Sequence, residues 1–161
     1  MATIAIRLIQ PKDNAALALI IRNALEDFKA NKPGTVYFDA TTDNLSEVFT
    51  TKGSVYFVAE QDGIILGGSG IYPTDNLPTA TCELVKLYLS STARGKGMGK
   101  LLMEKCFSAA KNMGYTKMYL ETMPELNIAV PLYEKSGFQY LSAPLGCSGH
   151  DGCNIWMIKD L

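Results

Sequence analysis

Residues 94–99 read Arg-Gly-Lys-Gly-Met-Gly, and they decide how the rest of the sequence is interpreted. They lie between a predicted strand, Thr81 to Leu89, and an apolar helical stripe that begins at Met98. Alternating glycines allow a tight turn and let the backbone approach a ligand closely. The start of the following helix offers unpaired N–H groups and a partial positive charge, so the segment predicts a pyrophosphate site.

Two phosphate loops found in other proteins do not match this segment. The ATP-type loop needs a glycine, four residues and then Gly-Lys-Ser/Thr. Counted back from Gly99 and Lys100, Arg94 stands at the first glycine and Leu101 at the Ser/Thr. The dinucleotide fingerprint needs a third glycine three residues after the second, and its two alignments place Lys100 or Leu102 there. The sequence therefore excludes both loops.

A third pattern matches: arginine, two residues, glycine, one residue and glycine, at Arg94, Gly97 and Gly99. This resembles the acetyl-CoA pyrophosphate loop of the GNAT superfamily of N-acetyltransferases. The segment 83–89 precedes the loop as the family's fourth strand does, and residues 129–138 resemble its later helix, which carries a tyrosine and ends in Gly-Phe. A glycine-rich surface turn is the alternative for the hexapeptide alone. The wider resemblance, from about residue 3 to the C-terminus, argues against it.

The periodicity of apolar residues predicts an alternation of helices and strands that agrees with this resemblance. Helices are expected after Asp13, its N-cap, and at 44–50, 98–113 and 129–136; strands are expected at 3–9, 54–60, 64–71, 81–89, 117–121, 138–141 and 154–158. The resemblance implies an α/β fold with a mixed, mostly antiparallel central sheet flanked by helices. Its fourth and fifth strands would splay apart. We expect a single N-acetyltransferase domain over residues 1–161.

Composition narrows the function classes. The chain has 161 residues, 15 basic and 16 acidic side chains, and a formal net charge of −1. No basic tract dominates, so nucleic acid is not an expected partner. The N-terminus lacks a secretory signal, and no apolar run suggests a membrane partner, so we expect a cytoplasmic location and four free cysteine thiols. The resemblance also allows a homodimer, without an interface signature.

The resemblance implies acetyl-CoA as co-substrate, bound in the cleft between the splayed strands. Main-chain groups of Leu87 and Leu89 would meet its pantetheine arm, and the Leu87 amide would serve as an oxyanion donor to the thioester. Both residues can equally be core strand residues. The other implied cofactor-binding residues are Arg94, Gly95, Lys96, Gly97, Met98, Gly99, Lys100 and Asn127. Asn127 departs from the family's spacing, because it lies two residues before Ala129 where three is usual.

Two side chains are candidates for acid–base catalysis. An attacking amine is mostly protonated at neutral pH, so a base must take its proton. Glu83 lies four residues before Leu87, where some family members carry a catalytic glutamate; strand alternation predicts that the two share a side, unless a bulge intervenes. Tyr133, four residues before Gly137, would protonate the leaving thiolate. The structural alternatives are a substrate-binding or exposed Glu83 and a tyrosine that packs on the sheet.

The acceptor site is less defined by the sequence. Residues in segments that shape it in related folds are Phe28, Tyr37, Phe38, Asp39, Tyr72 and Asp75, although aromatic residues there mostly pack. His150 is a further candidate for contact with the substrate. Cys147, His150 and Cys153 are evenly spaced, but structural zinc is normally four-coordinate and no fourth ligand is evident, so no metal is expected.

These residues predict transfer of the acetyl group of acetyl-CoA to a primary amine of a small molecule, peptide or protein, by direct attack in a ternary complex. The alternatives are a non-catalytic acetyl-CoA-binding module, against which the presence of Glu83 and Tyr133 argues, and an interaction domain that binds no CoA. The sequence does not identify the amine.

Overall fold

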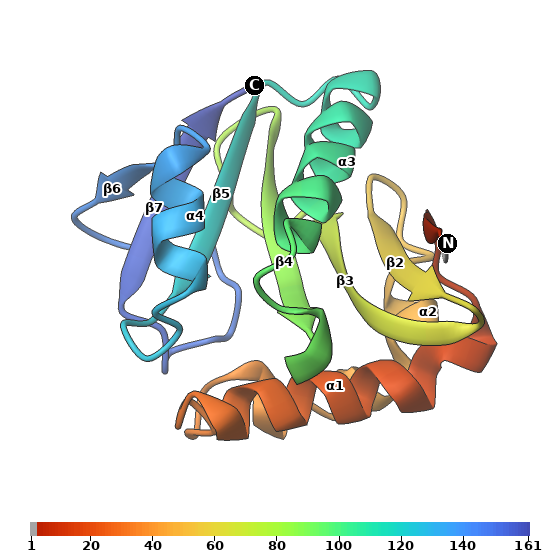
Figure 1. The fold of residues 1–161 in the computed structure, drawn as a ribbon. Helices are drawn as coiled ribbons and strands as arrows, with labels where there is room; N and C mark the ends of the chain where they lie inside the picture. Colours follow the sequence, from red (N-terminus) through yellow and green to blue (C-terminus); the bar gives the residue numbers. More distant parts are fainter. Residues whose placement is uncertain (1–2) are drawn as a thin grey trace.

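A computed structural model of the chain describes residues 3–161, and its strands form one seven-stranded sheet (Figure 1). The strands are β1 (Ile4–Leu8), β2 (Val55–Gln61), β3 (Ile64–Tyr72), β4 (Thr81–Leu89), β5 (Lys117–Thr122), β6 (Gln139–Leu141) and β7 (Ile155–Asp160). Their order across the sheet is β1-β2-β3-β4-β5-β7-β6. Only β4 and β5 pair in parallel, so the expected mixed, mostly antiparallel sheet is confirmed.

Helices cover both faces of this sheet. They are α1 (Asn14–Asp27), α2 (Leu45–Val48), α3 (Met98–Asn112) and α4 (Ala129–Lys135), with short 3-10 turns at Pro11–Asp13, Val36–Phe38, Ala40–Asn44 and Ser91–Ala93. Strand alternation separates the two cores: Tyr56 and Val58 pack with Ile21 of α1, whereas Phe57 packs with Met103 of α3. In Figure 1, α3 and α4 lie side by side over one face, and α1 runs across the end of the central strands.

The two parallel strands pair for only three residues. Thr81, Cys82 and Glu83 of β4 stand opposite Lys117, Met118 and Tyr119 of β5. Beyond Glu83 the two strands have no paired residues, although both continue. The expected splay of the fourth and fifth strands is therefore present, and it leaves backbone and side chains of both strands facing a gap.

A β-bulge interrupts β4 just beyond this point. Gly68 of β3 stands opposite Tyr88, and Gly70 stands opposite Val85, so two residues of β4 face one residue of β3. Lys86 carries the bulge with a φ of 54°. A bulge adds one residue to one strand and so reverses the alternation of side chains after it.

This reversal affects one prediction from the sequence. Leu84 and Leu87 both pack in the core under α3, whereas Val85 and Tyr88 pack in the core under α1. Glu83, two residues before Val85, therefore lies on the α1 side and Leu87 on the α3 side. Simple alternation therefore does not hold between Glu83 and Leu87, because a bulge, the exception that the sequence analysis named, lies between them.

Tyr56 holds the bulge from the neighbouring strand β2. Its hydroxyl donates a hydrogen bond to the Lys86 carbonyl at 2.8 Å. The ring needs the space beside Gly68, where a Cβ atom would lie 2.4 Å from Tyr56 Cε1. Glycine in this strand thus permits a close approach that fixes the backbone of β4.

The start of α1 differs from expectation in one detail. Asp13 does occupy the N-cap position, but its side chain makes no capping bond to the helix. Its buried carboxylate instead accepts two hydrogen bonds from Arg7, at 2.8 and 2.9 Å, and one from the Gln10 amide. The Arg7 guanidinium lowers the pKa of Asp13, so this carboxylate anchors β1 to α1 as an ion pair.

Candidate active site

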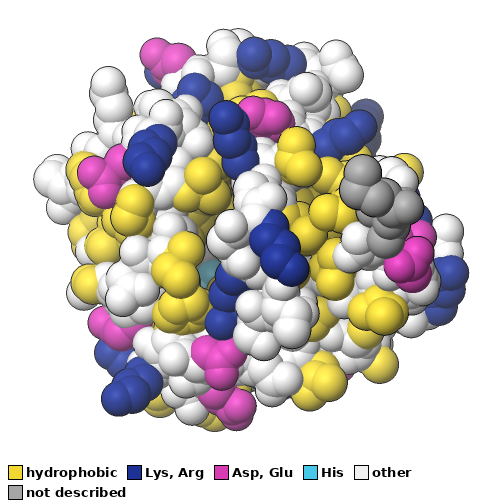
Figure 2. All heavy atoms as spheres, in the orientation of Figure 1, with side chains coloured by type: hydrophobic (Ala, Val, Ile, Leu, Met, Phe, Trp, Pro, Cys, Tyr) yellow, Lys and Arg dark blue, Asp and Glu magenta, His cyan; other side chains and the backbone are white. Residues whose placement is uncertain are grey.

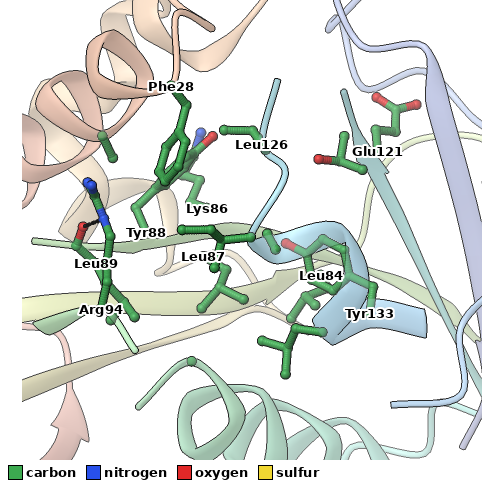
Figure 3. Close-up of a pocket in the computed structure, with 16 residues that line it drawn as sticks. Phe28, Leu84, Lys86, Leu87, Tyr88, Leu89, Arg94, Glu121, Leu126 and Tyr133 are labelled. Carbon is green, nitrogen blue, oxygen red and sulfur yellow. Dashed lines mark hydrogen bonds between the residues drawn. The ribbon is translucent and has the colours of Figure 1, made fainter. Parts of the chain in front are cut away.

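A cleft opens where β4 and β5 part, with a cavity of about 120 Å³ (Figure 3). Its walls come from Leu84 and residues 86–89 of β4, the end of β5 and one side of α4. Figure 3 shows Leu87 and Tyr133 on one side of it and Leu126 across from them. Figure 2, in the orientation of Figure 1, shows the face of the molecule on which the cleft opens. A hollow there lies between hydrophobic and basic side chains, and charged residues of both signs are scattered around it.

The glycine turn lies at the mouth of this cleft, and Gly99 lines the cavity. Gly97 is the N-cap of α3 with a φ of 78°, and the first helical hydrogen bond runs from Leu101 N to Gly97 O. None of the amides of residues 96–100 donates a hydrogen bond to another described residue. A Cβ at Gly95 or Gly97 would meet no atom within 4 Å. Unpaired amides around open space can form an anion cradle, and the pyrophosphate site at these residues remains a prediction.

Arg94 lines the cleft and also bonds two other segments of the chain. Its guanidinium bonds the Asp27 carboxylate at 3.2 Å and lies 4.8 Å from the centre of the Phe28 ring. Its Nε donates to the Leu89 carbonyl at 3.2 Å. Arg94 therefore connects the turn to the end of α1, and it engages the carbonyl of Leu89, a residue whose main-chain groups are expected to meet pantetheine.

Glu83 lies beside the cleft in a largely buried position, with 4% of its surface exposed. The Thr74 hydroxyl donates a hydrogen bond to its carboxylate at 2.5 Å. Burial raises the pKa of Glu83 to about 7, and the hydrogen bond from Thr74 only partly opposes this. A carboxyl group with a pKa near neutrality can both take and release a proton at working pH.

Tyr133 of α4 lies on the other side of the cleft. Its ring packs edge-on against Phe138 at 5.9 Å, and burial raises the pKa of its phenol far above the usual value. Among residues 3–161 its hydroxyl has no hydrogen-bond partner. Figure 3 shows that hydroxyl directed into the cavity. A neutral phenol in this position is an available proton donor.

A second cavity of about 330 Å³ lies on the α1 side of β4. Glu83, Lys86 and His150 line it together with Tyr72 and Asp39. A smaller pocket that also contains Glu83, Lys86 and His150 borders both the cleft and this cavity. Glu83 and Lys86 thus stand at the junction of the cleft with a space suited to a small ligand.

The comparisons with known proteins agree with this geometry. The model of the acetyltransferase (GNAT) family matches residues 20–138. The chain belongs to the GNAT family. It is similar to the uncharacterised N-acetyltransferase YjgM of Escherichia coli K12, with 38% identity over 93% of this chain and 90% of that protein.

Solved structures share the GNAT fold with this chain. An acetyltransferase of the GNAT family from Staphylococcus aureus Mu50 has a TM-score of 0.83 at 18% identity and covers 99% of both chains. The PaiA N-acetyltransferase of Thermoplasma acidophilum, solved in complex with coenzyme A, has a TM-score of 0.77 at 18% identity and also covers 99% of both. The resemblance in sequence and the fold expectation are confirmed, and the chain is an acyltransferase.

Some residues that the sequence offered for this GNAT site lie elsewhere. Asn127 is exposed and does not line the cleft, whereas Leu126 and Ile128 do. Tyr37 donates to Glu26 at 2.5 Å on the surface, and Phe38 is 61% exposed. None of Asn127, Tyr37 and Phe38 joins the cavities around Glu83, whereas Tyr72 and His150 do.

The sequence analysis did not identify four residues that line the site of this GNAT chain. Lys86, Thr74, Glu121 and Thr122 line the cleft or the adjoining cavities. Glu121 accepts hydrogen bonds from the hydroxyls of Tyr119 and Ser148, and the buried Thr122 hydroxyl has no partner among the described residues. Lys86 could have been identified from the sequence, because a lysine inside an otherwise apolar strand is unusual.

The evenly spaced cysteines and histidine have separate partners in this GNAT chain. His150 Nε2 lies 2.7 Å from an Asp39 oxygen, and Asn76 donates to Cys147 Sγ at 3.2 Å. Cys153 packs at the edge of the core under α1, and burial raises the pKa of its thiol to about 12. Among residues 3–161, no three His, Cys, Asp or Glu side chains are placed to hold a metal ion. Nor does any helix in that range have the length and apolarity to cross a membrane.

Proposed function

We propose that this enzyme transfers the acetyl group of acetyl-CoA to a primary amine, by direct attack while both substrates are bound. The observation that carries the proposal is that Tyr133 lines the cleft between β4 and β5, and that Glu83 lines a pocket that borders this cleft. Unpaired amides lie at the mouth of the same cleft. The coenzyme A complex of the Thermoplasma relative supports the choice of donor.

The residues of the cleft fit acetyl-CoA. The unpaired amides of residues 96–100 would hold its pyrophosphate, and the open space over Gly95 and Gly97 would admit it. The main chain around Leu87 would line its arm. Bound there, acetyl-CoA supplies an acetyl group activated as a thioester.

Glu83 would make the amine reactive. A primary amine is an ammonium ion at neutral pH and has no free electron pair for attack. A Glu83 carboxylate with a pKa of about 7 is ionised in half of the molecules at pH 7. It can therefore accept the ammonium proton, directly or through a water molecule.

Leu87 and Tyr133 would serve the other two requirements of the transfer. The Leu87 amide follows the bulge at Lys86, and a fixed amide donor stabilises negative charge on an acyl oxygen. The Tyr133 hydroxyl, directed into the cleft, can protonate the departing sulfur. Glu83, on the α1 side of β4, would serve the attacking nitrogen, and Tyr133, on α4, would serve the leaving sulfur as the C–N bond forms and the C–S bond breaks. The second proton of the amine would return to the Tyr133 oxygen or to solvent.

The test is thiol release from acetyl-CoA over a panel of amines, amino acids and peptides with free amino groups. We expect turnover with one class of amine and a fall of at least about 100-fold in Glu83→Gln, the lower range for loss of a general base. A rise in melting temperature with acetyl-CoA, but not with ATP, would show binding independently. Binding without any turnover would instead support the non-catalytic module.

A further inference from the structure

The second cavity, of about 330 Å³, is here called the acceptor cavity. The charged side chains that line it differ in how many hydrogen-bond or ion-pair partners they have. Asp39 is paired with His150 at 2.7 Å, and Glu83 accepts from Thr74 at 2.5 Å. Asp75, also on the wall, is exposed to solvent. Lys86 is different, because among the described residues its side-chain ammonium forms no hydrogen bond and no ion pair.

The position of Lys86 is imposed by the fold. It is the bulged residue of β4, with a φ of 54°, and its carbonyl is tied to the Tyr56 hydroxyl. It lines the cleft, the acceptor cavity and the pocket between them. In Figure 3 its side chain leaves β4 on the same side as Tyr88 and extends toward Leu126. A cation is therefore fixed where the amine and the acetyl donor must meet.

Such an arrangement is unfavourable without a ligand. Burial lowers the pKa of Lys86, and the carboxylates of Asp39 and Glu83 act against this without contacting its nitrogen. A half-buried cation is stabilised most by an anion in direct contact. The carboxylates of the wall already have partners or face solvent, so an anionic group of the substrate would supply the contact that Lys86 lacks.

We propose that the acceptor carries a carboxylate as well as its primary amine, and that Lys86 is the specificity residue that binds this carboxylate. The class of acceptor is a free α-amino acid. This inference rests on the proposed function and specifies its acceptor. Glu83 and Lys86 lie three residues apart on the same cavity wall, so they meet the two ends of a compact zwitterion, Glu83 the ammonium and Lys86 the carboxylate.

The cavity size agrees with this class. A volume of about 330 Å³ is at the lower end of the roughly 300–1,000 Å³ usual for small-molecule sites. A polyamine, the main alternative for a wall with several carboxylates, would place a further cation beside Lys86. Like charges in contact are unfavourable, so Lys86 selects against such acceptors.

The experiment compares acceptors that differ only in the carboxylate. Thiol release from acetyl-CoA is measured with L-leucine and L-leucinamide, with L-phenylalanine and L-phenylalaninamide, and with spermidine. We expect the amino acid to exceed its amide in kcat/KM by roughly 10- to 100-fold, the value of one charged hydrogen bond. In Lys86→Met the ratio of the two kcat/KM values, amino acid to amide, should fall toward one. Lys86→Arg should retain most of the wild-type ratio. The surface control Lys105→Met should retain the full wild-type ratio.

A binding measurement guards against a folding defect. N-acetyl-L-leucine is titrated into protein saturated with CoA, and its affinity is measured by calorimetry. We expect this affinity to fall by a similar factor in Lys86→Met, while the variant still binds CoA. Equal use of amides or of spermidine by the wild-type enzyme would overturn the inference and leave acetyl transfer intact. Thiol release with none of these acceptors would overturn the proposed transfer to small amines, and this inference with it.

Discussion

Thr74 Oγ1 donates a hydrogen bond to Glu83 Oε1 at 2.5 Å, and this bond links the loop after β3 to the proposed catalytic base on β4. Burial raises the pKa of Glu83 to about 7, and the Thr74 hydroxyl is the main group that lowers it again, because the bond stabilises the ionised form. If Glu83 is the base, as proposed, Thr74 helps to set the pH range in which the enzyme works.

Replacing Thr74 with valine should shift the pH profile. Without the donated bond, the pKa of Glu83 rises further. Glu83 then becomes protonated, and inactive as a base, at a higher pH than in the wild type. We expect the acidic limb of kcat/KM, near pH 7 in the wild type, to move up by about one unit. Thr74→Ser keeps the hydroxyl and should keep the wild-type limb. An unmoved limb in Thr74→Val would remove Glu83 as the titrating base.

Glu83→Gln should be more stable than the wild type, and only at higher pH. A carboxyl group with a folded pKa near 7 and an unfolded value of 4.5 favours folding most below pH 4.5 and loses this advantage as the pH rises to about 7. Glutamine is neutral throughout. At pH 8 we expect a gain of order 2 kcal/mol in the free energy of unfolding, which shrinks toward zero at pH 4.5. Urea melts at both pH values measure it.

The parts of the site that could be predicted from the sequence depend on local signals. The glycines of residues 94–99 specify the turn and the start of α3 by their own backbone requirements, and apolar periodicity specifies the strands and long helices. Tyr133 was inferred from the resemblance of residues 129–138 to the family's later helix, which carries a tyrosine and ends in Gly-Phe. None of these inferences needs to know which strand is paired with which.

The parts that failed depend on pairing between distant segments. The side on which Glu83 lies follows from the β3–β4 register and from Tyr56 bonding the Lys86 carbonyl, and no local pattern in β4 encodes that bulge. Arg94 lines the cleft as its place in the loop pattern suggests, but its contact with Asp27, 67 positions away, could not be predicted from the loop. Lys86 and Thr74 became site residues only because the strands splay beside them.

Tyr133→Phe should reduce turnover without weakening acetyl-CoA binding. The ring would keep its packing against Phe138 and lose only the hydroxyl, so the departing sulfur would lack its proton donor. We expect kcat to fall about 100-fold, the lower range for a general acid, with an unchanged melting-temperature shift by acetyl-CoA. Tyr140→Phe, on the exposed edge strand β6, is the control and should retain full kcat. Equal rates in both variants would assign Tyr133 to packing alone.

Gly97→Ala tests the anion cradle against a matched glycine. Gly97 and Gly63 have φ values of 78° and 77°, and a Cβ at either would meet no atom within 4 Å. Both substitutions therefore impose the same left-handed strain, roughly 1–2 kcal/mol. Only the methyl group at Gly97 would enter the space over the free amides at the start of α3, where the pyrophosphate is proposed to bind.

The two variants should consequently lose similar stability and differ in acetyl-CoA binding. We expect the dissociation constant of acetyl-CoA to rise about 10-fold or more in Gly97→Ala, as hydrogen bonds to a charged phosphate lengthen, and to stay at the wild-type value in Gly63→Ala. Calorimetric titration of acetyl-CoA into each protein measures both. Matching dissociation constants would mean that the pyrophosphate lies away from Gly97, since the strain is common to the two positions and only the location of the methyl group differs.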